Sequence, residues 1–266
     1  MKRDYIVWTS VAAAVVVLGI GTWIWRQRQQ PIEGTQTVTA PVPPASVPAP
    51  AEPQYQLDGT GAVASGAADL SGAVAELYGK KSAQSLFRLD DFSRRVVATV
   101  DNLGRAQAPA NLWPVNPVPG RFQVDGPGDQ GTVSAANANR YAAYVNLLDK
   151  VDLARAASLY RQFYPMLQKS YEDIGYPQGY FNDRLVAVID LLLATPEPSG
   201  APAVHLPVLD ASVQPTRPWV LYEFDDPALQ SLASGQKMLL RLDAGKRQRV
   251  KSRLTELRAR ITAKAG

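Results

Sequence analysis

The sequence contains no cysteine and only one histidine, His205. The first absence excludes disulfides, thiolate nucleophiles, zinc–cysteine sites, iron–sulfur clusters and a cysteine-linked lipid anchor. The second excludes any metal site or proton relay that needs several imidazoles. We therefore expect neither a bound metal nor a cofactor. The redox compartment stays open, because a cysteine-free chain suits an oxidising or a reducing one.

The motifs of two common enzyme chemistries are also missing. No Gly-x-Ser-x-Gly sequence is present to place a nucleophilic serine on a sharp turn, and His205 lies in a proline-rich stretch. The glycines at 126, 128 and 131 do not lead into a helix start with Lys and Ser or Thr, which a phosphate-binding loop requires. The sequence thus carries no named chemistry.

The net charge of +4 arises at one end of the chain. Residues 246–264 include eight basic side chains and one acidic, Glu256, so this stretch contributes +7 and the rest of the chain −3. A narrow apolar stripe repeats within it at helical spacing: Val250, Leu254, Leu257 and Ile261. We expect a basic C-terminal helix over residues 244–264 that packs by this stripe and leaves a cationic face in solvent. The alternative is a surface for nucleic acid, anionic lipid or an acidic partner.

An uncharged apolar run occupies residues 5–25. As a helix its 21 residues would measure about 31 Å, close to the hydrocarbon thickness of a bilayer. Aromatic side chains suited to the membrane interface lie at its two ends: Tyr5, Trp8, Trp23 and Trp25. A signal peptide would end in small residues at a cleavage site, where this chain has bulky residues followed by arginine. We predict an uncleaved, single-pass transmembrane anchor with a short cytoplasmic tail over residues 1–28, in contact with the lipid bilayer through residues 5–25.

The orientation of this anchor is not decided by flanking charge, because Lys2 and Arg3 precede it and Arg26 and Arg28 follow it. The free N-terminal amine and the short N-terminal tail favour a cytoplasmic N-terminus. The soluble domain would then lie across the membrane, a location that excludes nucleic acid as its partner.

A linker of biased composition follows the anchor. Seven prolines fall between residues 31 and 53, interleaved with Ala, Val, Thr and Ser, and glycines continue to residue 66. Such a composition cannot bury a core and favours extended polyproline II structure. We predict a flexible Pro/Ala/Gly-rich linker over residues 29–66, with a reach on the order of 100 Å.

Residues 67–266 are predicted to form one mainly α, compact helical domain of about five to seven helices joined by long Pro/Gly loops. Apolar residues at helical spacing indicate helices near 89–103, 139–149, 153–174, 182–194 and the basic C-terminus. Asp226 followed by Pro227 is a helix start, with a capping side chain and then proline at the first helical position. Loops are expected over 108–131 and 195–218, with short extended pieces near 204–209 and 219–224.

One segment concentrates groups that could hold a polar ligand at a helix start. It contains Tyr176, Tyr180, Asn182, Asp183 and Arg184. Free backbone N–H groups at a helix N-terminus add to its binding capacity. The structural alternative is that Asn182 caps the helix, Asp183 complements its dipole, Arg184 pairs locally and the aromatic rings join the core.

Further aromatic side chains, Trp219 and Tyr222, could extend such a surface into a groove for peptide or glycan, although core packing explains aromatic residues equally well. Adjacent carboxylates also occur, and a glycosidase needs two acids across its substrate. These pairs are Asp90–Asp91, Glu172–Asp173 and Asp225–Asp226. Each lies at a helix end or on a helix face, so no catalytic residue is assigned.

Several stretches resemble the proteobacterial family of unknown function DUF3014. They are Phe92–Leu103, Trp113-Pro-Val, Tyr160–Tyr164 with Pro165, Tyr176–Leu185, and Trp219–Leu229 running into 235–237. The similarity spans about residues 87–261, nearly the whole soluble domain. It implies a bacterial inner-membrane protein with this layout of anchor, stalk and domain, and it carries over no reaction, ligand or catalytic residue.

Two functions from different classes remain open. The first is a non-enzymatic module that binds an envelope protein or a cell-wall polymer at a distance set by the stalk. The second is a cell-wall glycan hydrolase that uses paired carboxylates such as Asp183 or Glu172. Carboxyl groups facing each other across a cleft would favour the hydrolase.

Overall fold

The structure is a computed structural model that describes residues 52–57, 69–127, 129–209 and 215–263. The anchor predicted over residues 1–28 and most of the linker predicted over 29–66 lie outside these ranges. Among the described residues, no helix has both the length and the apolar composition needed to cross a bilayer.

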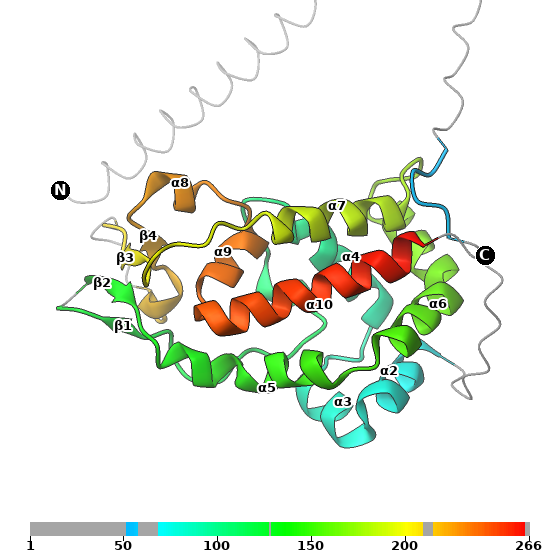
Figure 1. Ribbon diagram of the computed structural model, residues 1–266, viewed down its shortest axis with the longest axis horizontal. Coiled ribbons are helices and arrows are strands. Elements are labelled where there is room, and N and C mark those ends of the chain that lie inside the picture. The colour runs from blue at the N-terminus through cyan, green and yellow to red at the C-terminus, as the bar shows by residue number, and fades with distance from the viewer. Residues whose placement is uncertain (1–51, 58–68, 128, 210–214, 264–266) are drawn as a thin grey trace, which may run out of the picture. The chain divides into compact units, whose positions relative to one another are not determined.

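Helices make up most of the described chain (Figure 1). Nine of them are α-helices: α2 (Leu70–Tyr78), α3 (Lys80–Leu86), α4 (Phe92–Leu103), α5 (Asn137–Lys150), α6 (Leu153–Asp173), α7 (Phe181–Leu193), α8 (Pro227–Gln230), α9 (Ser234–Leu240) and α10 (Ala244–Thr262). Two 3-10 helices are η1 (Ala110–Leu112) and η2 (Pro218–Val220). The strands are β1 (Val124–Asp125), β2 (Gln130–Val133), β3 (Ala203–His205) and β4 (Glu223–Phe224).

The mainly helical prediction is confirmed, and the long periodic segments form the helices expected of them. In α6 the predicted apolar face is buried, and Asp152 caps the helix by accepting hydrogen bonds from Ala154 N and Arg155 N. Gly175 follows α6 with φ 116°, a conformation that residues with a Cβ avoid. Asp226 caps α8 as predicted, accepting a hydrogen bond from Ala228 N at 2.8 Å.

The prediction of five to seven helices joined by loops needs two corrections. The described residues contain nine α-helices, because α2, α3 and α9 are short segments without a long apolar period. They also contain an antiparallel sheet of strand order β1-β2-β3-β4. The segment 108–131, expected as loop, supplies β1 and the start of β2.

The strands of this sheet are short, and side-chain packing stabilises it. Residues 130–132 of β2 pair with 203–205 of β3, and no strand exceeds four residues. A cluster of buried side chains lies against it, made of Phe122, Val133, Val204, Phe224 and Leu240. Runs this short show no alternation that periodicity can detect, so tertiary contact decides where they form.

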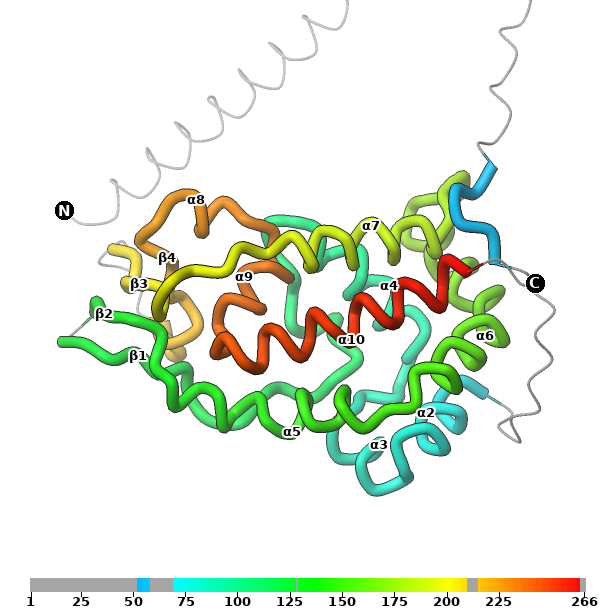
Figure 2. Tube along the Cα trace, viewed as in Figure 1, coloured from blue at the N-terminus to red at the C-terminus, as the bar shows by residue number. Residues whose placement is uncertain are grey.

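Helix α10 occupies the centre of the helical part. It packs against α5, α6 and α7, and the path of the chain in Figure 2 shows it running between α5 and α7. Ile261 near its C-terminus is fully buried with Val186 and Ile189 of α7. A second buried cluster joins Val97 of α4, Leu167 of α6 and Phe181 of α7. Helix α4 therefore packs on α6 and α7, as α10 does.

Candidate functional site

Asn182 lies in the first turn of α7 and connects three other parts of the chain. Its side chain is buried, with a residue exposure of 1%. Nδ2 donates hydrogen bonds to the carbonyl oxygens of Tyr55 at 2.9 Å and Ile261 at 3.3 Å, and Oδ1 accepts one from the Tyr160 hydroxyl at 3.0 Å. Burial raises the pKa of Tyr160 well above its usual value, so this hydroxyl stays a donor at neutral pH.

The prediction that Asn182 caps this helix is therefore wrong. Helix α7 begins one residue earlier, at Phe181, and Tyr180 stands at the N-cap position without a side-chain capping bond. Gln168 of α6 satisfies the free helix donor instead, since its Oε1 accepts a hydrogen bond from Phe181 N at 2.8 Å. A cap supplied from another helix leaves no local sequence signal.

Asp183 binds backbone from the far end of the sequence. Its Oδ2 accepts a hydrogen bond from Gln54 N and its Oδ1 accepts one from Tyr55 N, both at 2.9 Å. The carboxylate also lies in the first turn of α7, where the helix dipole favours negative charge. It thus binds a bend of its own chain, 128 sequence positions away at Tyr55.

The piece it holds belongs to the range predicted as linker. In residues 52–57, Pro53, Tyr55 and Leu57 are partly buried, while the intervening residues are exposed. The segment thus has one face on the surface of the domain, and its backbone bends at Gln54 and Tyr55. The Tyr55 ring packs in the cluster of Val186, Ile189 and Ile261, and the Arg258 guanidinium lies 5.9 Å from its centre.

Arg184 and Tyr176 meet at a buried carboxylate on α4. Asp101 has a residue exposure of 4%. Its Oδ1 accepts a hydrogen bond from Arg184 Nε at 3.0 Å, and its Oδ2 accepts from Arg105 Nε at 3.0 Å and from the Tyr176 hydroxyl at 3.2 Å. Tyr176 in turn stacks on Tyr171 with ring centres 4.5 Å apart. The expected local pairing of Arg184 is wrong: its partner lies 83 positions away.

The other two predicted site residues lie elsewhere. Trp219 and Tyr222 are partly buried against the cluster under the sheet, whereas residues 176–184 lie at the α6–α7 connection (Figure 1). The Arg121 guanidinium covers the Trp219 ring at 4.3 Å, and Tyr222 contacts Phe122 with ring centres 5.8 Å apart. The structure therefore divides the seven candidate residues into two separate groups.

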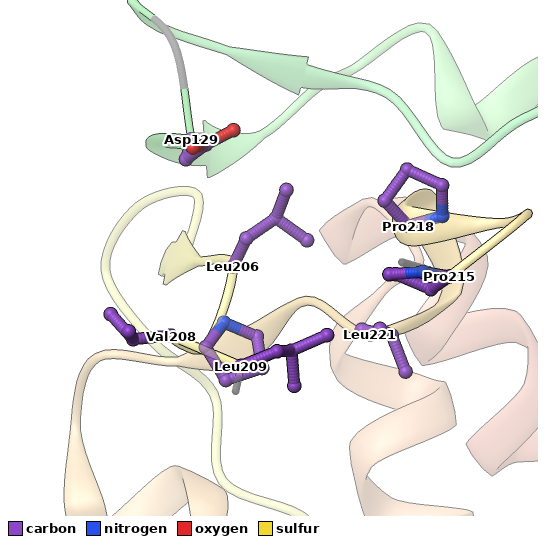
Figure 3. A pocket seen from close by; sticks show the side chains of 8 residues that line it. Asp129, Leu206, Val208, Leu209, Pro215, Pro218 and Leu221 are labelled. Carbon is purple, nitrogen blue, oxygen red and sulfur yellow. The ribbon is translucent and has the colours of Figure 1, made fainter. Parts of the chain in front are cut away.

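A shallow apolar pocket lies beside Trp219 and is not signalled by any sequence motif. Its volume is about 330 Å³, and it is lined by residues 206–209, Pro215, Pro218 and Leu221, with Asp129 at its border (Figure 3). The exposed apolar side chains here are Val208, fully exposed, Val220 at 58% and Leu209 at 38%. We call this region, with its three exposed residues, the sheet-end surface.

The adjacent carboxylates are used in local structure. A hydrogen bond from Arg95, at 2.6 Å, lowers the pKa of Asp90. Asp173 pairs with Lys169 at 2.6 Å, and Glu172 accepts a hydrogen bond from Gln168 at 3.0 Å. Asp225 lies 2.5 Å from His205 Nδ1, while Asp226 caps α8. Within the described ranges, no group of three or more His, Asp or Glu side chains is arranged to hold a metal ion.

The basic C-terminal helix is confirmed as α10, but its charge is largely matched within the domain. Each of the seven basic residues between 246 and 260 makes an ion pair. Arg247 is 3% exposed and lies 2.6 Å from Glu197, which also pairs with Lys251. Burial acts to raise the pKa of Glu197, but these two cations outweigh it and lower the pKa. The expected cationic face is thus only partly present.

These features define a mainly helical domain with a small antiparallel sheet, an apolar surface at the sheet and an N-terminal segment docked on α7. Residues 92–258, more than half of the chain, match the family described as Protein of unknown function (DUF3014), and the chain belongs to this family. Comparisons with curated proteins and with solved structures found no match.

Proposed function

We propose that this protein is a non-enzymatic, membrane-tethered binding module of the bacterial envelope. Its contact region would be the sheet-end surface, and its partner an envelope protein or a cell-wall polymer. The anchor at residues 5–25 would hold it in the inner membrane with the domain in the periplasm. The apolar run, its aromatic ends and the proline-rich stretch support this placement.

The exposure of Val208, Leu209 and Val220 carries the proposal. Single exposed apolar residues are common on soluble domains, but here Val208 and Leu209 line one apolar pocket, and Val220 directly precedes Leu221, which also lines it. Covering them removes apolar surface from water, at about 25 cal/mol per Å². A protein partner is favoured over a polymer of sugars, because the pocket offers apolar side chains and one carboxylate rather than a row of hydrogen-bonding groups.

The charged side chains around the sheet indicate which charges the partner would carry. Carboxylates lie on the strands or directly beside them: Asp125, Asp129, Glu223, Asp225 and Asp226. Four arginines lie in the same part of the structure, Arg121, Arg140, Arg217 and Arg241, so the five carboxylates outnumber these arginines by one. A complementary segment would carry apolar side chains together with lysine or arginine.

The hydrolase alternative has weaker support. Asp183 accepts hydrogen bonds from two backbone N–H groups and Glu172 accepts one from Gln168, so both carboxylates are already engaged within the domain. A hydrolase requires two such groups across its substrate. Release of soluble fragments from peptidoglycan sacculi by the purified protein would revive this alternative.

The test compares the wild-type chain with the variants Val208→Ser and Val220→Ser. Each is immobilised and exposed to solubilised envelope proteins and, separately, to sacculi. The control is Met166→Ser, which changes an apolar side chain of similar exposure, 44%, on α6. We expect one partner to bind the wild type and the control and to be lost from both pocket variants. The proposal fails if neither preparation binds the wild type, or if the pocket variants bind as well as the control.

A further inference from the structure

Residues 52–57 dock on α7 and α10. The groups that receive the segment are Asn182, Asp183, Val186, Arg258 and Ile261, which we call the latch site. Asn182 and Asp183 bind its main chain. The Tyr55 ring packs on the cluster that contains Val186 and Ile261, and the Arg258 guanidinium lies near the ring.

The main-chain contacts meet the segment at a bend of its backbone, at Gln54 and Tyr55. Asp183 accepts from two consecutive N–H groups, those of Gln54 and Tyr55, and Asn182 donates to the carbonyl of Tyr55. A bend turns consecutive N–H groups toward the same side, where one carboxylate can accept from both. Such contacts recognise a bent backbone and are indifferent to side-chain identity. Hydrogen bonds that involve a carboxylate are also stronger than neutral ones.

The ring contacts supply specificity. Tyr55 packs against Val186 and Ile261, and Arg258 is positioned near the ring by its ion pair with Asp190, at 2.5 Å. An aromatic side chain with a cation near its face gains both burial and cation–π attraction. A small side chain at this position would lose both.

We propose that the latch site is a peptide-binding site for a short segment that bends at a central tyrosine, and that residues 52–57 are its ligand in cis. When the site is occupied, the linker between the predicted anchor and the domain ends at residue 52. When it is empty, the linker ends at residue 69, the N-cap of α2. Opening the site would lengthen the linker by 17 residues, at most about 60 Å. This proposal does not depend on the sheet-end surface or its partner.

The first measurement is hydrogen exchange of the complete chain, resolved to single amides. The amides of Gln54 and Tyr55 should exchange at least tenfold more slowly in the wild type than in Asp183→Asn. Asp173→Asn, which removes a carboxylate from an exposed ion pair on α6, is the matched control and should keep the protection. If the two amides exchange without protection in the wild type, at the same rate as in Asp183→Asn, the segment is not bound and the proposal fails.

The second measurement adds a fluorescent peptide of sequence Glu-Pro-Gln-Tyr-Gln-Leu in trans. A tethered ligand competes at an effective concentration in the millimolar range. The peptide should therefore bind the complete Tyr55→Ala chain, whose own segment is weakened, at least tenfold more tightly than the wild type. Two altered peptides should not bind. In one, Ala replaces Tyr; in the other, the backbone amides that correspond to Gln54 and Tyr55 are N-methylated.

Changes in the peptide leave the fold of the protein untouched, so they separate recognition from stability. The proposal is overturned if wild type and Tyr55→Ala bind the peptide equally, or if N-methylation has no effect. Failure here would leave the sheet-end surface unaffected, because Val208 and Val220 take no part in either measurement.

Discussion

Replacing Asp101 by Asn should destabilise the domain more than any other exchange of an acid for its amide. The carboxylate is 4% exposed and receives hydrogen bonds from Arg184, Arg105 and Tyr176. Removing one partner of a buried ion pair costs about 3–5 kcal/mol, because the other charge stays buried without compensation. The Arg184 side chain is 29% exposed and Arg105 is 52% exposed, so solvent can compensate part of the loss.

We therefore expect the lower end of that range, about 3 kcal/mol. For a domain of this size the melting temperature falls by about 2–4 °C per kcal/mol, which gives a decrease of about 6–12 °C. Thermal unfolding followed by circular dichroism, with urea unfolding as a second probe, measures the change. Asp90→Asn is the control, since its carboxylate pairs with Arg95 at the surface, and its midpoint should fall far less than that of Asp101→Asn. A loss below about 1 kcal/mol for Asp101→Asn would refute the view of this cluster as a buried, mutually dependent unit.

Two further predictions concern packing and pH. Gly235→Ala should lower the free energy of unfolding by about 1–3 kcal/mol, because a Cβ there would lie 2.6 Å from Leu192 Cδ2 and 3.1 Å from Leu103 O. The control is Gly200→Ala, whose Cβ would have no atom within 4 Å, and it should leave the free energy of unfolding unchanged in the same urea titration. The hydrogen bond from Arg258 lowers the pKa of Asp190 below its usual value of 3.8, so the stability it contributes is present above about pH 4 and is lost as the pH falls through the lowered pKa. The urea midpoint of Asp190→Asn should thus lie below that of the wild type at pH 7 and approach it in strong acid; a difference that is constant with pH would contradict this.

The sequence by itself determined the long helices. In α6 and α7 the apolar residues recur at helical spacing over 21 and 13 residues, so each helix carries its own signal for the face that it buries. The cap at Asp226 was equally readable, because a capping side chain and the N–H that it satisfies lie two residues apart. The match to the family likewise lies in local motifs of the chain.

The tertiary structure alone decided the sheet and the use of the candidate site. Strands of two to four residues have no period to detect, and they form where the cluster around Leu240 covers them. Asn182, Asp183 and Arg184 were recognised as a concentration of polar groups, but each has a partner 79 or more positions away, at Ile261, Gln54 and Asp101. The partner of a buried amide or carboxylate depends on how distant segments pack, and the local spacing of residues in the sequence does not predict that packing.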